Sequence, residues 1–299
     1  MSGTAGIAWL DGRWGRATEL AVPLQDRGLR LGDGLFETVL VLAGRVQLLE
    51  QHLERWQASA ALLAMAPPPR REWLAPLISE AITRARLPEG NGALRLNWSR
   101  GDGGRGIDLP DAAGHAHKPS ERFWLQLDAH DPQFTPLTAH ISRQERRQAE
   151  SLLSRCKTFA YGQAIQARRE ARAAGAEEAL LLNGRGELCC GAVANLLVQR
   201  AGQWLTPPCS SGCLPGVMRG RAIASGLAQE HRLEPRPQAG DQWLLINSLS
   251  CRPLRQVNGQ PLAALSAAEA EQLWRQLLEE APPPADPGLS CSPGWRCGR

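Results

Sequence analysis

The pattern of apolar and polar residues through the first 130 positions predicts a mixture of strands and helices. A hairpin is expected over residues 7–21, with Asp11-Gly12 as the turn between two short apolar runs. Further strands are expected at residues 35–42, 45–49, 93–98 and 123–127. Apolar residues at helical spacing predict helices over 50–64 and 71–85. The polar residues 25–28 are interpreted as a loop.

The second half continues this mixture of strands and helices. Strand-like stretches begin near Thr135 and recur at residues 178–182, 194–200, 203–205 and 243–247. Helices are expected at residues 161–174, 216–229 and 267–280. We find no internal repeat, so the pattern predicts a mixed α/β (α+β) fold of two domains, residues 1–130 and 135–280. The Gly/Pro/Ser-rich residues 281–299 are interpreted as a disordered tail.

Composition narrows the class of protein. A chain of 299 residues with 43% apolar and 21% charged residues can bury two cores. No apolar run approaches the roughly 20 residues that cross a bilayer, and no basic segment precedes an apolar one at the N-terminus, so we expect a cytoplasmic protein with no membrane partner. The net charge is +4, but acidic residues are interleaved and no basic stripe is present, which argues against a nucleic-acid partner.

The cysteines and histidines do not predict a metal site. Eight cysteines form no CxxC pair and no Cys/His pattern with zinc-ligand spacing, so reduced thiols are expected. His115 and His117 lie beside Lys118 in a polar stretch, which favours a solvated loop over a metal-binding tract.

Lysine is almost absent from the chain. Of the 34 basic residues only Lys118 and Lys157 are lysines, and the rest are arginines. Arginine replaces lysine in solvation and in most ion pairs, but its guanidinium cannot serve as an amine nucleophile. A lysine that survives this bias is a candidate for amine chemistry, and chance survival on the surface is the alternative. Lys157 stands just before a predicted helix, whereas Lys118 lies in a polar loop.

Six motifs around Lys157 occur in an order that resembles a known family. They are Asp26-Arg27-Gly28 with Leu31 to Thr38, His52-Leu53-Glu54-Arg55, Arg100 to Gly106, Lys157-Thr158-Phe159-Ala160-Tyr161, Ala194-Asn195-Leu196 and Leu214 to Arg219. Over about residues 5–275 the chain is similar to the fold-type IV pyridoxal-phosphate enzymes, the family of branched-chain and D-amino-acid aminotransferases. Within this family it looks most like the 4-amino-4-deoxychorismate lyases.

The resemblance implies a fold, a cofactor and a site. It implies a smaller N-terminal and a larger C-terminal domain with pyridoxal 5'-phosphate between them, held by Lys157 as a Schiff base, and a homodimer with a loop of one subunit near the other's site. It assigns cofactor contacts to Lys157, Arg55, Cys190, Asn195, Gly216, Val217, Met218 and Ser248.

These assignments have physical reasons and simpler alternatives. An arginine fork suits a phosphate dianion, and the amides at a helix N-terminus bind anions. Arg55 is otherwise a surface arginine, and Ser248 an ordinary turn serine.

The resemblance assigns catalytic roles to Lys157, Thr38 and Arg105. Arg105 lies in the Gly103-Gly104-Arg105-Gly106 stretch, which resembles the lyase form of a loop whose arginine meets a substrate carboxylate. A flexible glycine connector is the alternative for this loop, and a β-branched strand residue is the alternative for Thr38.

Cys190 departs from the family pattern. Family members usually have a glutamate at this position, placed to protonate the pyridine nitrogen of the cofactor, and Glu187 is out of register for that task. A thiol is a weak hydrogen-bond donor and would not keep the pyridine nitrogen protonated as a carboxylate does. The cofactor ring is therefore expected to be a weaker electron sink. Transamination depends heavily on the protonated ring, whereas aromatisation drives the lyase reaction.

The first hypothesis is therefore a lyase that releases pyruvate from aminodeoxychorismate and forms 4-aminobenzoate for folate biosynthesis. A D-amino-acid or branched-chain aminotransferase is the alternative enzyme. A relative without catalysis, serving in binding or regulation, is the third hypothesis, and Cys190 is its only support.

Overall fold

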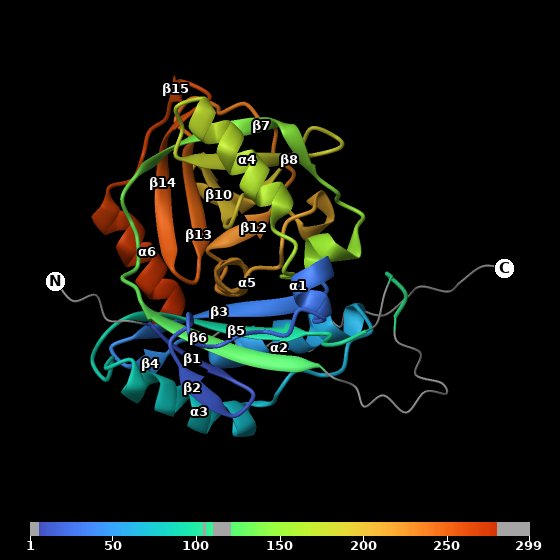
Figure 1. The fold of residues 1–299 in the computed structure, drawn as a ribbon. Helices are drawn as coiled ribbons and strands as arrows, with labels where there is room; N and C mark the ends of the chain where they lie inside the picture. The colour runs from blue at the N-terminus through green and yellow to red at the C-terminus, as the bar shows by residue number, and fades with distance from the viewer. Residues whose placement is uncertain (1–5, 104–105, 110–120, 280–299) are drawn as a thin grey trace, which may run out of the picture.

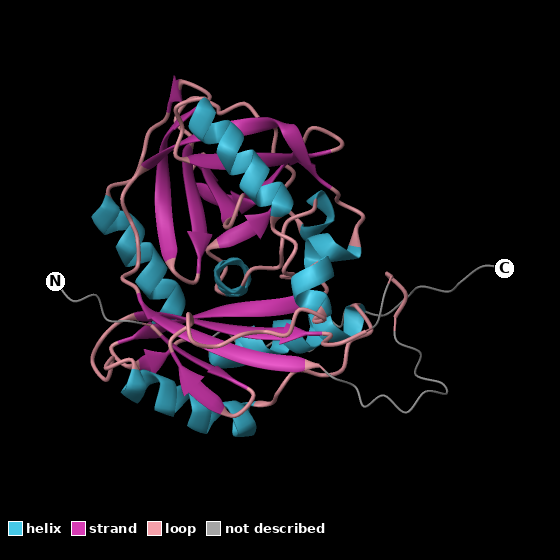
Figure 2. Ribbon diagram, viewed as in Figure 1, coloured by secondary structure: helices cyan, strands magenta, loops and turns pink. Residues whose placement is uncertain are grey.

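The computed structural model describes residues 6–103, 106–109 and 121–279. These residues form two sheets, one from each half of the chain, with helices packed on the outer faces and also between the sheets (Figures 1 and 2). The predicted tail lies outside the described residues, as do His115, His117 and Lys118. No helix in the described ranges is long and apolar enough to cross a membrane.

The first sheet has six antiparallel strands in the order β2-β1-β6-β5-β3-β4. Its strands are β1 (Ile7–Leu10), β2 (Arg13–Gly15), β3 (Gly34–Leu42), β4 (Arg45–Val46), β5 (Gly92–Ser99) and β6 (Arg122–Ala129). Helices α2 (Leu49–Leu62) and α3 (Arg71–Arg84) cover one face, where Trp56 and Leu74 pack into the core against Leu35. In Figure 1 the opposite face looks toward the second sheet.

The second sheet closes on itself. Its strands are β7 (Leu137–Arg147), β8 (Glu178–Asn183), β9 (Leu188–Gly191), β10 (Asn195–Arg200), β11 (Gln203–Thr206), β12 (Ala228–Glu230), β13 (Gln242–Asn247), β14 (Ser250–Val257) and β15 (Gln260–Pro261). The path β10-β13-β14-β7-β8-β9 returns to its start, because β9 pairs again with β10. The pair that closes this ring is Cys190 with Asn195.

Helices complete the second half. They are α4 (Gly162–Ala173), α5 (Val217–Ala224), α6 (Ala267–Glu279) and the short 3-10 turns η1 (Leu152–Arg155) and η2 (Cys209–Ser211). Helix α4 packs on β7 and β8, whereas α6 packs on β14 and α5. Trp274 of α6 is fully buried, and the centre of its ring lies 5.3 Å from the centre of the Phe134 ring.

Some predicted elements were wrong. Residues 25–28 are not a loop throughout, because the Asp26 side chain accepts the amide of Gly28 at 2.8 Å and starts α1 (Arg27–Leu31). The helix predicted over 216–229 ends at Ala224, and Ala228–Glu230 instead adds β12 to the sheet beside β11. Strands β9 and β14 were missed. The mixed α/β architecture of two units is confirmed.

One join between the two halves is made of backbone. The amide of Phe36 donates to the carbonyl of Lys157 at 2.9 Å, and the amide of Phe159 donates to the carbonyl of Gly34 at 3.0 Å. The segment that carries Lys157 thus pairs with the start of β3, although it belongs to the second half. A Cβ on Gly34 would overlap the ring of Phe159. Glycine at position 34 therefore lets β3 and the Lys157 segment lie next to each other.

A second join is a buried polar network centred on Glu37. Its carboxylate accepts Arg55 Nε at 2.9 Å and lies 2.7 Å from His52 Nδ1, and both partners stand on α2. His52 Nε2 lies 3.1 Å from Ser248 Oγ, and Arg55 Nη1 donates to Pro215 O at 3.2 Å.

Charge balance keeps Glu37 ionised. Burial favours the neutral acid, but the Arg55 charge and the His52 hydrogen bond outweigh it and hold the pKa of Glu37 at about 2. Burial also lowers the pKa of His52. The network therefore joins β3 and α2 of the first half to two turns of the second.

Gly34→Ala is expected to destabilise the protein by about 1–3 kcal/mol, because the added methyl group displaces the Phe159 ring from a packed site. Urea denaturation followed by tryptophan fluorescence measures the change. Gly184→Ala is the matched control, since no atom lies within 4 Å of a Cβ built there. An unchanged urea midpoint for Gly34→Ala would show that the Lys157 segment and β3 can move apart without loss of stability.

The Glu37 network predicts an acid-sensitive stability. The pKa of Glu37 is depressed in the folded protein, so its contribution is present above the unfolded pKa of about 4.3 and is lost as pH falls toward about 2. In Glu37→Gln the slope of unfolding free energy between pH 5 and 2 should be shallower, by up to about 1.4 kcal/mol per pH unit. Glu54→Gln changes an exposed carboxylate on α2, the helix that carries His52 and Arg55, and should keep the wild-type slope.

Candidate active site

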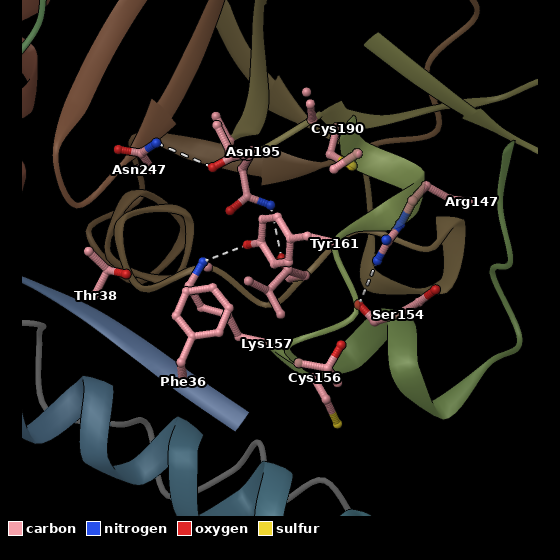
Figure 3. A pocket seen from close by; sticks show the side chains of 18 of the residues that line it. Phe36, Thr38, Arg147, Ser154, Cys156, Lys157, Tyr161, Cys190, Asn195 and Asn247 are labelled. Atoms are coloured by element: carbon pink, nitrogen blue, oxygen red, sulfur yellow. Dashed lines mark hydrogen bonds between the residues drawn. The ribbon is translucent and has the colours of Figure 1, made fainter. Parts of the chain in front are cut away.

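A cavity of about 510 Å³ lies between the two sheets, where the two joins meet. Strands β3 and β5 of the first half contribute lining residues, and so do the Lys157 segment, the β9–β10 turn, the start of α5 and the β13–β14 turn of the second half (Figure 3). The structure brings together at this cavity every sequence-predicted site residue that it describes, namely Lys157, Thr38, Arg55, Cys190, Asn195, Gly216, Val217, Met218 and Ser248.

Lys157 projects into the cavity with its amine in a defined position. Its Nζ donates to Tyr161 Oη at 3.1 Å and lies 4.4 Å from the centre of the Phe36 ring. Figure 3 shows Lys157 and Tyr161 facing each other across this hydrogen bond. The pairing of the Lys157 carbonyl with β3 fixes the backbone, so only the side chain is free to move.

One end of the cavity is built to receive an anion. Gly216 is the N-cap of α5, and no side chain caps the amides of the first turn, which begins at Val217. A Cβ on Gly216 would overlap Oδ1 of Asn195, whose Nδ2 donates to Leu214 O at 2.9 Å. Asn195 therefore shapes the turn that presents these amides.

Arg55 and Ser248 lie at the same cavity. The fork of Arg55 spans from Glu37 to Pro215, and its side chain is only 11% exposed. The hydroxyl of Ser248 is held by His52. A guanidinium, a hydroxyl and the start of α5 thus surround one end of the cavity, which is an arrangement suited to a phosphate.

The opposite side contains Cys190 and Arg147. Burial raises the pKa of the Cys190 thiol, although Arg147 opposes this shift. Arg147 Nε donates to Gly212 O at 3.0 Å and Nη2 donates to Ser154 O at 3.2 Å, so two carbonyls fix its guanidinium. Figure 3 shows both side chains on the far side of Tyr161 from Phe36.

Glu187 does not compensate for the missing acid. It accepts Asn183 Nδ2 at 2.7 Å and pairs with Arg185 and Arg232, and it does not line the cavity. The hydrogen bonds from Asn183 and Arg185 hold the pKa of Glu187 at about 2. Cys190 is therefore the side chain that faces the cavity where the resemblance places an acid.

Two cationic side chains of the cavity, Arg147 and Arg95, were not predicted from the sequence, and Arg95 lies on the wall formed by the first sheet. It stands opposite Thr38 in the β3–β5 pair, and its Cζ lies 3.5 Å from the centre of the Phe36 ring. Its Nε donates to Asn97 Oδ1 at 2.7 Å, and burial lowers its pKa. Polar residues at positions 95 and 97 of an otherwise apolar strand were the available signal, since alternate residues share a face.

Arg105 lies outside the described residues. Next to it in the chain, Ile107 O and Asp108 O each accept a hydrogen bond from Arg27 at 3.1 Å. None of the described residues of this loop lines the cavity of its own chain.

The described lining residues carry charge of one sign. Arg55, Arg95, Arg147 and Lys157 are present, and none of the described lining residues is an aspartate or a glutamate. Such a cavity favours ligands with several negative charges.

Comparisons with known proteins agree with this geometry. Residues 34–257 match the model of the family described as amino-transferase class IV. The chain is 24% identical over 272 residues to the D-alanine aminotransferase of Bacillus licheniformis, covering 85% of this chain and 89% of that protein. Over 70 residues it is 40% identical to a bifunctional aminodeoxychorismate lyase / D-amino acid transaminase of Mycobacterium tuberculosis, covering 23% of this chain and 24% of that protein.

The fold has solved counterparts. The branched-chain amino acid aminotransferase of Escherichia coli superposes with a TM-score of 0.80 at 20% identity, over 92% of this chain and 95% of that chain. The family match spans most of the chain and both sheets, and it includes Lys157 and the start of α5. The chain therefore belongs to the amino-transferase class IV family, whose members are pyridoxal-phosphate-dependent enzymes.

Proposed function

We propose that the protein is a 4-amino-4-deoxychorismate lyase, which releases pyruvate and forms 4-aminobenzoate for folate biosynthesis. The observation that carries this proposal is the charge of the cavity, which has four cationic side chains and no carboxylate among its described lining residues. A phosphate dianion and a substrate with two carboxylates supply matching negative charge.

The residues present fit pyridoxal phosphate. The uncapped start of α5, the Arg55 fork and the Ser248 hydroxyl would hold the phosphate, and the cavity volume of about 510 Å³ suits a cofactor together with a small substrate. Lys157 would be the covalent anchor, because no other lysine lies in the described ranges. When bound, the cofactor supplies an electron sink.

Lys157 would then move one proton. Its Nζ takes the proton from the ring carbon that bears the substrate's amino group, the bond to the enolpyruvyl oxygen breaks, and the ring becomes aromatic. The departing enolpyruvate gains a proton at its methylene carbon and becomes pyruvate, so no water is consumed. Tyr161 Oη, at 3.1 Å, directs the amine during this transfer.

Arg95 would bind a substrate carboxylate from the β5 side, next to Thr38. Its side chain is partly buried and uses Nε for Asn97, which leaves the two terminal nitrogens to bind a ligand. Arg105 is proposed to meet a second carboxylate, from the loop of the other subunit of a homodimer.

Exposed apolar side chains near the cavity support the homodimer. Leu29 and Leu31 of α1, Leu152 and Leu153 of η1 and Ile165 of α4 are between 43% and 60% exposed. Leu153 also lines the cavity, so a partner covering this surface would border the site. A cytoplasmic location is proposed together with this function.

Aminotransferase activity is the second candidate. It is favoured by the D-alanine aminotransferase of Bacillus licheniformis, which aligns over 85% of this chain. Cys190 argues against it, because a buried thiol with a raised pKa cannot hold a proton on the cofactor's ring nitrogen as a carboxylate does. Both candidate reactions use the same phosphate site. They differ in whether the residue at position 190 must keep the ring nitrogen of the cofactor protonated.

Lys157→Ala should abolish the visible absorbance of the bound cofactor and lower 4-aminobenzoate formation by about 10³-fold or more, because it removes both the anchor and the base. Lys118→Ala is the matched control and should keep both signals. Absorbance that persists in Lys157→Ala would defeat the assignment of the anchor. Wild-type protein that makes 2-oxo acids from amino acids but no 4-aminobenzoate would favour the aminotransferase.

Cys190→Glu should shift the balance between the two reactions. A carboxylate at this position can hold a proton at the ring nitrogen, so transamination of D-alanine should rise on the order of tenfold, equivalent to about 1.4 kcal/mol, while 4-aminobenzoate formation changes less. Cys190→Ser is the control, since it supplies no acid. Parallel assays of both products on each variant measure the ratio, and an equal ratio in all three proteins would contradict the role given to Cys190.

A further inference from the structure

Two thiols lie together just before the turn that starts α5. Cys209 opens η2, and Cys213 follows Gly212, whose φ of 102° turns the chain back toward the first thiol. The Cys213 thiol donates to the carbonyls of Pro207 at 3.4 Å and of Pro208 at 3.6 Å, directly before Cys209 in the chain, and both cysteines pack in one buried cluster. Among the described cysteines Cys209 alone is partly exposed, whereas Cys213 is fully buried. The pair thus has one accessible thiol and one thiol behind it.

The loop around the pair is held from three sides. Arg147 Nε donates to Gly212 O at 3.0 Å, Asn183 Nδ2 donates to Ser211 O at 3.2 Å, and Cys189 Sγ lies 2.6 Å from the same oxygen. These contacts fix the backbone between the two cysteines. The Cys213 thiol is therefore held beside the peptide group that precedes Cys209.

Electrostatics separates the two thiols. The neighbouring Cys213 thiol and the Arg219 charge outweigh burial and lower the pKa of Cys209 to about 7, while the neighbouring Cys209 and burial raise the pKa of Cys213. Arg219 is buried and fixed by Pro207 O at 2.8 Å. By contrast, burial raises the pKa of Cys251 to about 12. A thiolate is the attacking species in disulfide exchange.

We propose that Cys209 and Cys213 form a redox-active pair, which small disulfides such as glutathione disulfide convert to an intramolecular disulfide. Cys209 loses its proton to solvent and attacks one sulfur of the small disulfide, whose S–S bond breaks and releases one thiolate. Cys213 then gives up its proton and attacks Cys209 Sγ, releasing the second thiolate. The pair loses two electrons, and the small disulfide is reduced to two thiols.

The alternative of a metal site finds no support in the ranges that the structure describes, where no three metal-ligating side chains gather. The position of the pair gives oxidation a structural consequence. Cys213 is followed by Leu214 and Pro215, whose carbonyls accept hydrogen bonds from Asn195 and Arg55. A disulfide would restrain the chain directly before this turn.

Peptide mass spectrometry of the folded, reduced protein tests the proposal, in a Cys291→Ser/Cys297→Ser background that removes the tail thiols. Incubation with glutathione disulfide should yield a Cys209–Cys213 disulfide peptide. Cys213→Ser should instead retain glutathione on Cys209, and Cys209→Ser should retain none at either position. Cys156→Ser is the control and should form the disulfide as the parent does.

The rate of exchange gives a second readout. In Cys213→Ala, which unlike serine leaves no O–H or S–H group beside Cys209, exchange at Cys209 at pH 7 should be several-fold slower than in the parent protein. In the parent the rate should rise with an apparent pKa near 7 rather than the ordinary value of about 8.5. Absence of the disulfide at every glutathione ratio, its formation only in urea, or equal reactivity of Cys209→Ser would overturn the proposal.

Discussion

The pairing of the Lys157 segment with the start of β3 is the constraint on which the rest of the site depends. Two backbone hydrogen bonds, from Phe36 to Lys157 and from Phe159 to Gly34, dock a strand-like piece of the second half onto the first sheet. This contact places the amine of Lys157 over Phe36 and within reach of Tyr161. Glycine at position 34 is required because the Phe159 ring occupies the space of a side chain. A cavity between two sheets thereby acquires a fixed nucleophile.

The charged residues are arranged so that the cavity stays cationic, while the carboxylates around it are paired with arginines. Glu37 balances Arg55 from outside the cavity, and Glu187, directly before β9, pairs with Arg185 and Arg232. The charged side chains among the described lining residues are therefore guanidinium and amine groups alone. The cost of burying Arg55 and Glu37 is offset by their mutual hydrogen bonds, and breaking one partner would leave the other unpaired. The same network orients Ser248 through His52.

Much of the fold and much of the site could be predicted from the sequence. Lys157 stood out because arginine replaces lysine nearly everywhere else. The family resemblance assigned Arg55, Asn195, Gly216 and Ser248 to the cofactor, and all four line the same cavity. Other features depend on contacts that no local pattern reveals. Helix α1 exists through the Asp26 cap, and β12 exists because residues 228–230 find β11 as a partner. Arg95 was hidden among many arginines, and only the β3–β5 register places it beside Thr38. The Cys209–Cys213 pair required the left-handed turn at Gly212.

The identity of the residue that holds the cofactor is the central claim. Borohydride reduction of the purified protein, followed by peptide mass spectrometry, tests it directly because reduction makes the bond between cofactor and lysine permanent. The account predicts a phosphopyridoxyl group on the peptide that contains Lys157 and on no other peptide. A label on Lys118, or no label on a protein that retains bound pyridoxal phosphate, would contradict it.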